Sequence, residues 1–356
     1  MGRIGHVAVG QYGTILTSSD GTIWEKKSSG TTKSIQCITY GNGKFVAVGD
    51  SGAILVSSDA VTWTSITWEI FENLMSVTFA NGQFVAVGWR GSILTSSDAI
   101  NWTNRQPTQT VWTDWLRAVT YGNNQFLVAS QHGSILTSTD AITWASSIIN
   151  PAGYYDLLSV FYSNSLFIAV GYGGKILSSP NDSIWTESTS GTINCLWSIT
   201  YCNNQFVALG DSGTILTSTD AIIWTIRKSG TVLSLRSATY GNKLFVAVGE
   251  SGIILVSKAN DSMGIIQNIS DRFHTNKLKT TNSKKYLSIT LQGIHFNEGY
   301  TITWCNTSGK KIYSYVTHVQ GATIRMPLFR LAAGTYFITL IDNGYNRLSS
   351  SFIVTK

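Results

Sequence analysis

The chain has 356 residues, about twice the length of an ordinary domain. Charged residues make up 12% of it, half the globular average of about 25%, whereas 43% is hydrophobic. This composition excludes a disordered chain, because enough apolar side chains are present to form a core. No apolar run approaches the roughly 18 residues of a membrane span, and no export signal follows Met1.

The formal net charge of +6 is concentrated in the C-terminal part of the chain. Residues 1–257 hold 13 Lys and Arg against 15 Asp and Glu, whereas residues 258–356 hold 12 against 4. The larger part therefore lacks the basic surface that binding to DNA or RNA requires. We expect no nucleic-acid partner.

A repeat of about 40 residues runs through the larger part of the chain. The apolar string FVAVG and its variants end, once per repeat, at Gly10, Gly49, Gly88, Ser130, Gly171, Gly210 and Gly249. A tryptophan recurs with the same offsets at Trp24, Trp63, Trp102, Trp144, Trp185 and Trp224. Each repeat predicts four short strands joined by tight turns. Seven such units, arranged radially, bury both faces of every sheet, so the sequence predicts an all-β, seven-bladed β-propeller over residues 1–280.

The first repeat lacks its first strand. Tyr40 and Tyr240 end this strand in the second and seventh repeats, and 39 residues before Tyr40 lies Met1. The position 39 residues after Tyr240 is Lys279. We therefore expect residues 276–280 to supply the missing strand and close the ring, because an unpaired sheet edge is unfavourable.

One turn in five of the seven repeats carries the pattern Ser-x-Asp followed by tryptophan, as in SSDAVTW at 57–63 and STDAITW at 138–144. This pattern resembles the Asp-box, or BNR, hairpin, although the usual form has one more residue between Asp and Trp. The resemblance implies a propeller in which the aspartate accepts backbone N–H groups and the tryptophan packs between sheets. These structural positions are Asp20, Asp59, Asp98, Asp140, Asp220, Trp24, Trp63, Trp102, Trp144, Trp185 and Trp224. The fifth repeat has Asn181 instead of the aspartate.

Residues 281–356 form a second, smaller all-β pattern. TSGKKIYS at 307–314, RLAAGTYFITLIDNG at 330–344 and the closing FIVTK resemble the C-terminal sorting domain of type IX secretion cargo. That resemblance implies an Ig-like sandwich, recognition by the secretion machinery and a secreted or cell-surface location. An Ig-like accessory module is the alternative. Such cargo also needs an N-terminal signal peptide, so we expect a mature or truncated chain.

No metal or cofactor site is expected. Cys37, Cys195, Cys202 and Cys305 form no ligand spacing, and the five histidines do not repeat. We expect free, mostly buried thiols and a monomer.

The residues expected to bind a ligand are those that differ between repeats. In a propeller, the turn between the second and third strands lies on the same face as the connections between blades, where ligands approach. The turns and the three longest connections supply aromatic and polar side chains in this region. They are Trp89, Arg90, His132, Tyr172, Trp68, Trp112, Trp115, Tyr154 and Tyr155.

Two function classes fit this face. Flat aromatics beside carboxylates suit sugars, and aromatic patches also suit proteins, so the first hypothesis is a non-catalytic module that binds a glycan or a protein. The alternative is a polysaccharide hydrolase or lyase, for which no catalytic residue is assigned. Its candidate carboxylates are Asp50, Glu250, Asp114 and Asp211. A sialidase is disfavoured, because Arg90 is the only arginine expected in a turn.

Overall fold

The chain forms two compact units, residues 1–268 and residues 269–356, in a computed structural model. The first unit thus ends before the predicted boundary at residue 280. The described residues of the first unit are 5–67, 71–105, 115–148, 156–241, 244–258 and 267–268. Those of the second unit are its strands, whose bounds are given below.

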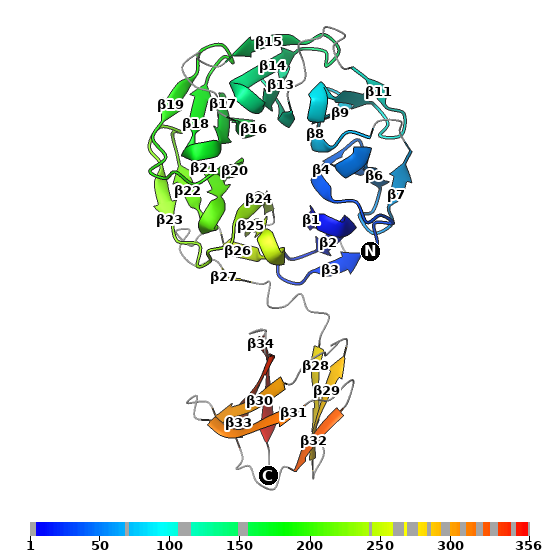
Figure 1. Cartoon of the computed structure of the whole chain (residues 1–356), viewed down its shortest axis with the longest axis vertical. Helices are drawn as coiled ribbons and strands as arrows, with labels where there is room; N and C mark the ends of the chain where they lie inside the picture. Colours follow the sequence, from blue (N-terminus) through cyan, green and yellow to red (C-terminus); the bar gives the residue numbers. More distant parts are fainter. Residues whose placement is uncertain are drawn as a thin grey trace. The chain divides into compact units, whose positions relative to one another are not determined.

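The first unit consists of seven antiparallel sheets arranged radially (Figure 1). Blade one has β1 (His6–Gly10), β2 (Thr14–Ser18) and β3 (Glu25–Lys27). From the inner to the outer strand, blades two to four are β4 (Ile35–Gly41), β5 (Lys44–Gly49), β6 (Ile54–Ser57) and β7 (Thr64–Ile66); β8 (Leu74–Ala80), β9 (Gln83–Gly88), β10 (Ile93–Ser96) and β11 (Thr103–Asn104); and β12 (Leu116–Gly122), β13 (Gln125–Ser130), β14 (Ser134–Ser138) and β15 (Ala145–Ile148). Blades five to seven are β16 (Leu157–Ser163), β17 (Leu166–Gly171), β18 (Ile176–Ser179) and β19 (Thr186–Ser188); β20 (Leu196–Cys202), β21 (Gln205–Gly210), β22 (Ile215–Ser218) and β23 (Thr225–Arg227); and β24 (Leu235–Gly241), β25 (Leu244–Gly249), β26 (Ile254–Lys258) and β27 (Gln267–Asn268). The predicted seven-bladed, all-β propeller is confirmed.

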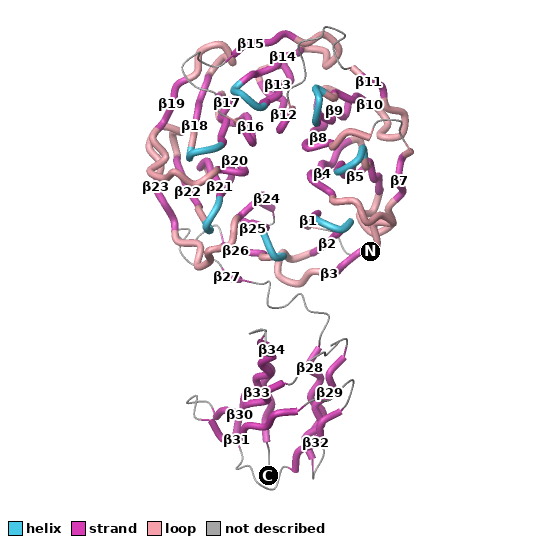
Figure 2. The backbone as a smooth tube through the Cα atoms, in the orientation of Figure 1, coloured by secondary structure: helices cyan, strands magenta, loops and turns pink. Residues whose placement is uncertain are grey.

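A three-residue 3-10 turn joins the second and third strands of each complete blade, and β1 to β2 in blade one (Figure 2). These turns are η1 (Gln11–Gly13), η2 (Asp50–Gly52), η3 (Trp89–Gly91), η4 (Gln131–Gly133), η5 (Tyr172–Gly174), η6 (Asp211–Gly213) and η7 (Glu250–Gly252). The closing residue needs to be glycine. At Gly174, φ is +72°, and a Cβ atom would lie 2.0 Å from the carbonyl oxygen of Thr192 in the connection to the next blade. The turns and the connections therefore meet on one face, as predicted.

Neighbouring blades pack through an aromatic layer. The aromatic residue near the end of each inner strand contacts a phenylalanine of the next strand, as in Phe79 and Phe84, whose centroids are 4.6 Å apart. The same phenylalanine lies 6.3 Å from the blade's tryptophan, Trp102. A glycine of the preceding blade's inner strand makes room for this inner-strand aromatic, since a Cβ on Gly41 would lie 2.0 Å from Phe79. Inter-blade packing of this kind explains why so few charged residues are needed.

The Ser-x-Asp turns are held by their own hydrogen bonds. Asp140 Oδ1 accepts the backbone N–H groups of Ile142 and Thr143, each at 2.8 Å, and the hydroxyl of Ser138 at 2.9 Å. Such bonds favour the ionised carboxylate: the N–H groups of Ile23 and Thr22 lower the pKa of Asp20 to about 2. All five box aspartates make equivalent bonds, at Asp20, Asp59, Asp98, Asp140 and Asp220. Membership of the Asp-box family stays a prediction.

The tryptophan of this turn closes it from the other side. Trp102 Nε1 donates to the carbonyl of Ala99 at 3.0 Å, and Trp185 Nε1 donates to that of Asp182 at 2.8 Å. Trp144 Nε1 is the exception, because it has no hydrogen-bond partner among the described residues. Asn181 replaces the aspartate in the fifth turn with longer bonds, at 3.3 Å from Ser183 N and 3.2 Å from Ile184 N.

The expected closure of blade one by residues 276–280 stays a prediction. This stretch lies in β28 (Lys277–Asn282), which pairs antiparallel with β29 (Tyr286–Gln292) in the second unit. Its alternating pattern correctly indicates a strand, but alternation does not specify which strand is its partner. Among the described residues, the sheet of blade one has three strands.

The second unit contains two antiparallel sheets. One has the order β28, β29, β32 (Thr323–Pro327), and the other has the order β31 (Lys311–Thr317), β30 (Tyr300–Asn306), β33 (Gly334–Asp342), β34 (Arg347–Val354). An Ig-like sandwich stays a prediction for this unit. In the part of the chain that the structure describes, no helix is long and apolar enough to cross a membrane.

Candidate functional site

The second residue of each inner strand lies beside the 3-10 turn of its own blade. Gln36 Nε2 donates to Asp50 Oδ1 at 2.8 Å, and Trp197 Nε1 donates to Asp211 Oδ1 at 2.6 Å. We call the inner-strand and turn residues on this face the rim. Unlike the blade framework, the rim changes from blade to blade: the inner-strand positions are Gln36, Met75, Arg117, Leu158, Trp197 and Arg236.

One group of rim residues is continuous across blades five, six and seven. The Tyr172 ring meets the indole of Trp197 edge-on, with centroids 6.0 Å apart. The guanidinium of Arg236 lies over the same indole, 3.8 Å from its centroid, and forms an ion pair with Glu250. Together with Asp211, these residues form what we call the Trp197 cluster.

The Trp197 cluster combines exposed and charged groups. Tyr172 remains 42% exposed, so its ring is accessible from solvent. The side chains of Arg236 and Glu250 are 39% and 44% exposed. A cation on an indole, beside two carboxylates and an open phenol ring, offers a ligand both apolar contact and hydrogen bonds.

None of these contacts joins two of the candidate catalytic carboxylates. Asp50, Asp211 and Glu250 each bond to a different inner-strand residue of their own blade. The hydrogen bond from Arg236 lowers the pKa of Glu250. A general acid in glycoside hydrolysis needs a raised pKa, so this environment does not favour Glu250 in that one role. Asp114 lies outside the described residues.

A second aromatic group lies between blades three and four. Trp89 of η3 stacks on Trp115, which directly precedes β12, with centroids 4.5 Å apart and an interplanar angle of 10°. Arg117 lies 5.0 Å from the centroid of Trp115. The indole N–H of Trp89 is buried and has no hydrogen-bond partner among the described residues. These three residues form what we call the Trp89 cluster.

The remaining predicted binding residues are dispersed. Arg90 Nη1 lies 3.1 Å from Glu72 Oε1, and the backbone N–H of His132 donates to Asp156 Oδ1 at 3.2 Å. Trp68, Trp112, Tyr154 and Tyr155 lie outside the described residues. The structure therefore brings together Trp89 with Trp115, and Tyr172 with the two carboxylates Asp211 and Glu250.

Sequence reasoning missed Arg117, Trp197 and Arg236. Their position lies inside a strand whose other residues repeat, so the turns and connections alone were expected to supply binding residues. Its variation between blades is the signal that would have identified it. The argument against a sialidase counted Arg90 as the only arginine on this face, and Arg117 and Arg236 correct that count. The three arginines nevertheless contact different partners in three blades.

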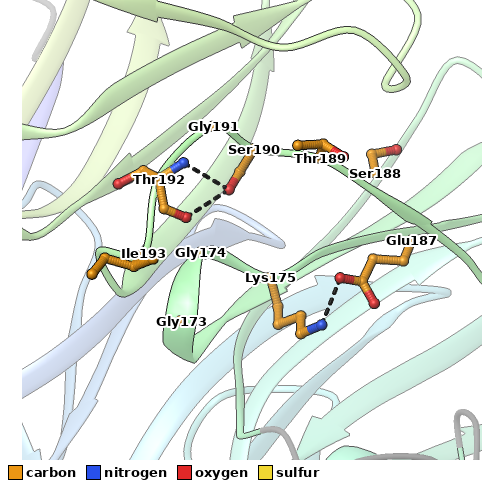
Figure 3. Close-up of a pocket in the computed structure, with 10 residues that line it drawn as sticks. All are labelled: Gly173, Gly174, Lys175, Glu187, Ser188, Thr189, Ser190, Gly191, Thr192 and Ile193. Carbon is orange, nitrogen blue, oxygen red and sulfur yellow. Dashed lines mark hydrogen bonds and ion pairs between the residues drawn. The ribbon is translucent and has the colours of Figure 1, made fainter.

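A shallow hollow of about 570 Å³ is lined by residues 173–175, which directly follow Tyr172 in the sequence, and by residues 187–193 (Figure 3). Lys175 Nζ lies 2.5 Å from Glu187 Oε1, and Ser190 Oγ donates to the carbonyl of Thr192 at 3.0 Å. The lining residues are Gly173, Gly174, Lys175, Glu187, Ser188, Thr189, Ser190, Gly191, Thr192 and Ile193. Hydroxyl and charged groups make this hollow polar, but Lys175 and Glu187 pair with each other, and the hydroxyls of Ser188 and Ser190 donate to backbone carbonyls.

The described residues contain no group of three or more His, Cys, Asp or Glu side chains able to hold a metal. Cys37, Cys195 and Cys202 are free thiols, as predicted. Burial raises the pKa of Cys202 to about 11, so this thiol is a poor nucleophile.

Comparison with known proteins gives different matches for the two units. Residues 283–355 match the family model of the secretion system C-terminal sorting domain. No curated protein matches the sequence of the chain.

Several solved structures share the propeller fold. A structure described as YCF48 bound to D1 peptide is 17% identical, covers 74% of this chain and 91% of its own, and has a TM-score of 0.59. Virginiamycin B lyase from Staphylococcus aureus is 13% identical, with coverage of 71% and 94% and a TM-score of 0.58. The WD40 propeller of Doa1 is 13% identical, with coverage of 74% and 87% and a TM-score of 0.53. At these identities the similarity establishes the fold alone.

The sorting-domain match assigns a destination to the protein and identifies the secretion machinery as a partner of its C-terminal unit. The chain is therefore a seven-bladed β-propeller followed by a secretion system C-terminal sorting domain, and it is a secreted or cell-surface protein.

Proposed function

We propose that the propeller is a non-catalytic binding module that recognises a glycan through the Trp197 cluster. The observation that carries this proposal is the continuous contact from Tyr172 through Trp197 and Arg236 to Glu250. Sugar C–H faces pack on aromatic rings, and their hydroxyls need acceptors such as Asp211 and Glu250. Arg236, whose guanidinium lies over the same indole, adds hydrogen-bond donors.

A protein ligand is the second candidate, supported by exposed apolar residues on the same face. Tyr12 of η1 is 81% exposed, and Ile193 and Val232 in the connections between blades are 88% and 84% exposed. Apolar side chains beside aromatics and arginine are typical of protein interfaces. The structure of YCF48 with a D1 peptide is consistent with this use of the fold.

The test is a screen of the full chain against plant and algal polysaccharides, with protein capture from the same source as the second assay. A glycan ligand should bind at least about tenfold more weakly to Tyr172→Ala and Arg236→Ala, a loss of about 1.4 kcal/mol. The matched control is Arg90→Ala. The exposed guanidinium of Arg90 forms an ion pair with Glu72, outside the cluster.

Three results would overturn the glycan assignment. Unchanged affinity in both cluster variants would place the site elsewhere. Binding of proteins without binding of glycans would favour the second candidate. Turnover of a polysaccharide that is lost in Glu250→Gln would favour the hydrolase or lyase alternative, since an amide cannot transfer the proton.

A further inference from the structure

The hollow in blade five coincides with a departure from the repeat (Figure 3). The middle residue of the 3-10 turn is Gly173 in η5, whereas the other six turns have a side chain at this position. Those six residues are Tyr12, Ser51, Arg90, His132, Ser212 and Ser251. Gly173 lines the hollow, and a Cβ atom on it would meet no atom within 4 Å among the described residues. The missing side chain therefore contributes open space to the hollow.

The turn itself does not require this glycine. Gly173 has a φ of +66°, and the six residues at the equivalent position have φ between +50° and +62°. Residues with side chains thus adopt the same left-handed conformation in every other blade. What distinguishes Gly173 is the space beside it, not the conformation of its backbone.

The walls of the hollow suit a sugar. Lys175 and Glu187 form an ion pair, and their side chains are 17% and 53% exposed. Such a pair offers donors and acceptors to sugar hydroxyls. Ile193 is 88% exposed and offers an apolar surface to sugar C–H groups. The volume of about 570 Å³ lies within the range of roughly 300–1,000 Å³ that ligand pockets occupy.

The hollow adjoins the Trp197 cluster. Gly173 directly follows Tyr172, the cluster residue of blade five. The Cys195 thiol makes hydrogen-bonding contacts with the backbone of Gly173 and with the carboxylate of Asp211. Asn194, at the end of the connection that lines the hollow, donates to the carbonyl oxygen of Asp211 at 3.3 Å. A chain-like ligand on the cluster can therefore extend into the hollow.

We propose that the hollow is a second sugar subsite, so that the propeller binds a neutral oligosaccharide chain rather than a single terminal sugar. This inference rests on the proposed glycan-binding function of the Trp197 cluster. The cluster holds one end of the bound segment, and the hollow holds the sugars that follow past Tyr172.

The charges around both subsites favour a neutral chain. Lys175 and Glu187 cancel, and Asp211, Arg236 and Glu250 sum to −1. A chain of uronic acids would bring further negative charge towards the two carboxylates of the cluster, and juxtaposed like charges oppose binding. Neutral sugars meet no such repulsion.

The test measures calorimetric affinities of the full chain for di- and hexasaccharides of cellulose, xylan, mannan and laminarin, with hexagalacturonate as the acidic counterpart. At least one neutral hexasaccharide should bind at least about tenfold more tightly than its disaccharide, because it occupies the hollow as well as the cluster. Hexagalacturonate should bind at least about tenfold more weakly than that hexasaccharide.

The decisive variants replace Gly173. Gly173→Arg extends a long side chain from the wall of the hollow, and Gly173→Ser is the matched control with a short one. Arg90 and Ser212 hold these residues at the same position of their own turns, with φ of +52° and +53°. Because both variants impose the same left-handed conformation, they should melt within about 1 °C of each other. Gly173→Arg should lose the roughly tenfold advantage of the hexasaccharide and keep the affinity for the disaccharide, whereas Gly173→Ser should keep both within about threefold.

The subsite is overturned if the two lengths bind equally to the wild type, if Gly173→Arg keeps the advantage of the hexasaccharide, or if Gly173→Ser loses as much as Gly173→Arg. The proposed function survives those results as long as Tyr172→Ala weakens the binding of both lengths. Equal affinity for hexagalacturonate contradicts the assignment of a neutral chain. Absence of binding to every oligosaccharide overturns the subsite and the glycan function together.

Discussion

The two ends of each blade differ in what the repeat preserves. At the Ser-x-Asp turn, five blades share the same carboxylate, the same two N–H donors and a tryptophan. At the rim, the residues differ from blade to blade, from the Gln36 and Asp50 pair to the Arg236 and Glu250 pair. The backbone geometry of each end is the same in all blades, so the variation at the rim is not needed to build the fold. The repeated end therefore serves stability, and the varied end is free to serve recognition.

The largest effect on stability is expected in the packing between blades. Phe206 is fully buried and lies 4.8 Å, centroid to centroid, from Tyr201. Phe206→Ala should cost about 3–5 kcal/mol through lost burial and a cavity, which lowers the melting temperature by about 10 °C. Calorimetry measures this change; a shift below about 2 °C would show that the layer contributes little.

A smaller loss is expected at the Ser-x-Asp turn. Asp140→Ala removes the acceptor for Ile142 N and Thr143 N, so the melting temperature should fall by about 2–4 °C. Asn181→Asp is the opposite change in blade five, where the bonds are longer, and should raise the melting temperature by about 1 °C. A fall in Asn181→Asp would contradict this account of the turn.

The turns should also make stability depend on pH. The pKa of Asp20 and that of Asp59 are lowered to about 2 by backbone N–H groups, from about 3.9 in an unfolded chain. A depressed folded-state pKa adds stability that is fully present above about pH 4 and is lost as the pH falls towards 2. Denaturant unfolding between pH 5 and 2 (roughly the span of these pKa values) should show this loss, with a shallower slope in Asp20→Asn.

The smallest effect on the ring is expected from removing the second unit. Because β28 pairs with β29, deletion of residues 269–356 should change the melting temperature of the propeller by less than about 2 °C. Closure of blade one by residues 276–280 would require a sharp fall. Scanning calorimetry of the truncated and full chains distinguishes the two.

The sequence predicted the blades well because their information is local and repeated. FVAVG or a variant of it and the turn glycine recur in every blade, and the tryptophan recurs in six of the seven, so each copy supports the others. The partner of residues 277–282 was not predictable, because strand pairing is non-local and alternation alone leaves it open. The roles of Trp197 and Arg236 depend on contacts between blades, which no single repeat contains.

The most direct test measures stability and ligand affinity on the same preparations of four proteins: wild type, Tyr172→Ala, Arg236→Ala and Asp140→Ala. The ligand is the glycan selected by the polysaccharide screen. The rim variants should lose at least about tenfold in affinity while melting within about 1 °C of the wild type, because exposed ion pairs contribute little stability. Asp140→Ala should melt lower and bind normally. Rim variants that bind normally, or affinity that falls in step with melting temperature in all three variants, would contradict the division between the two ends of the blade.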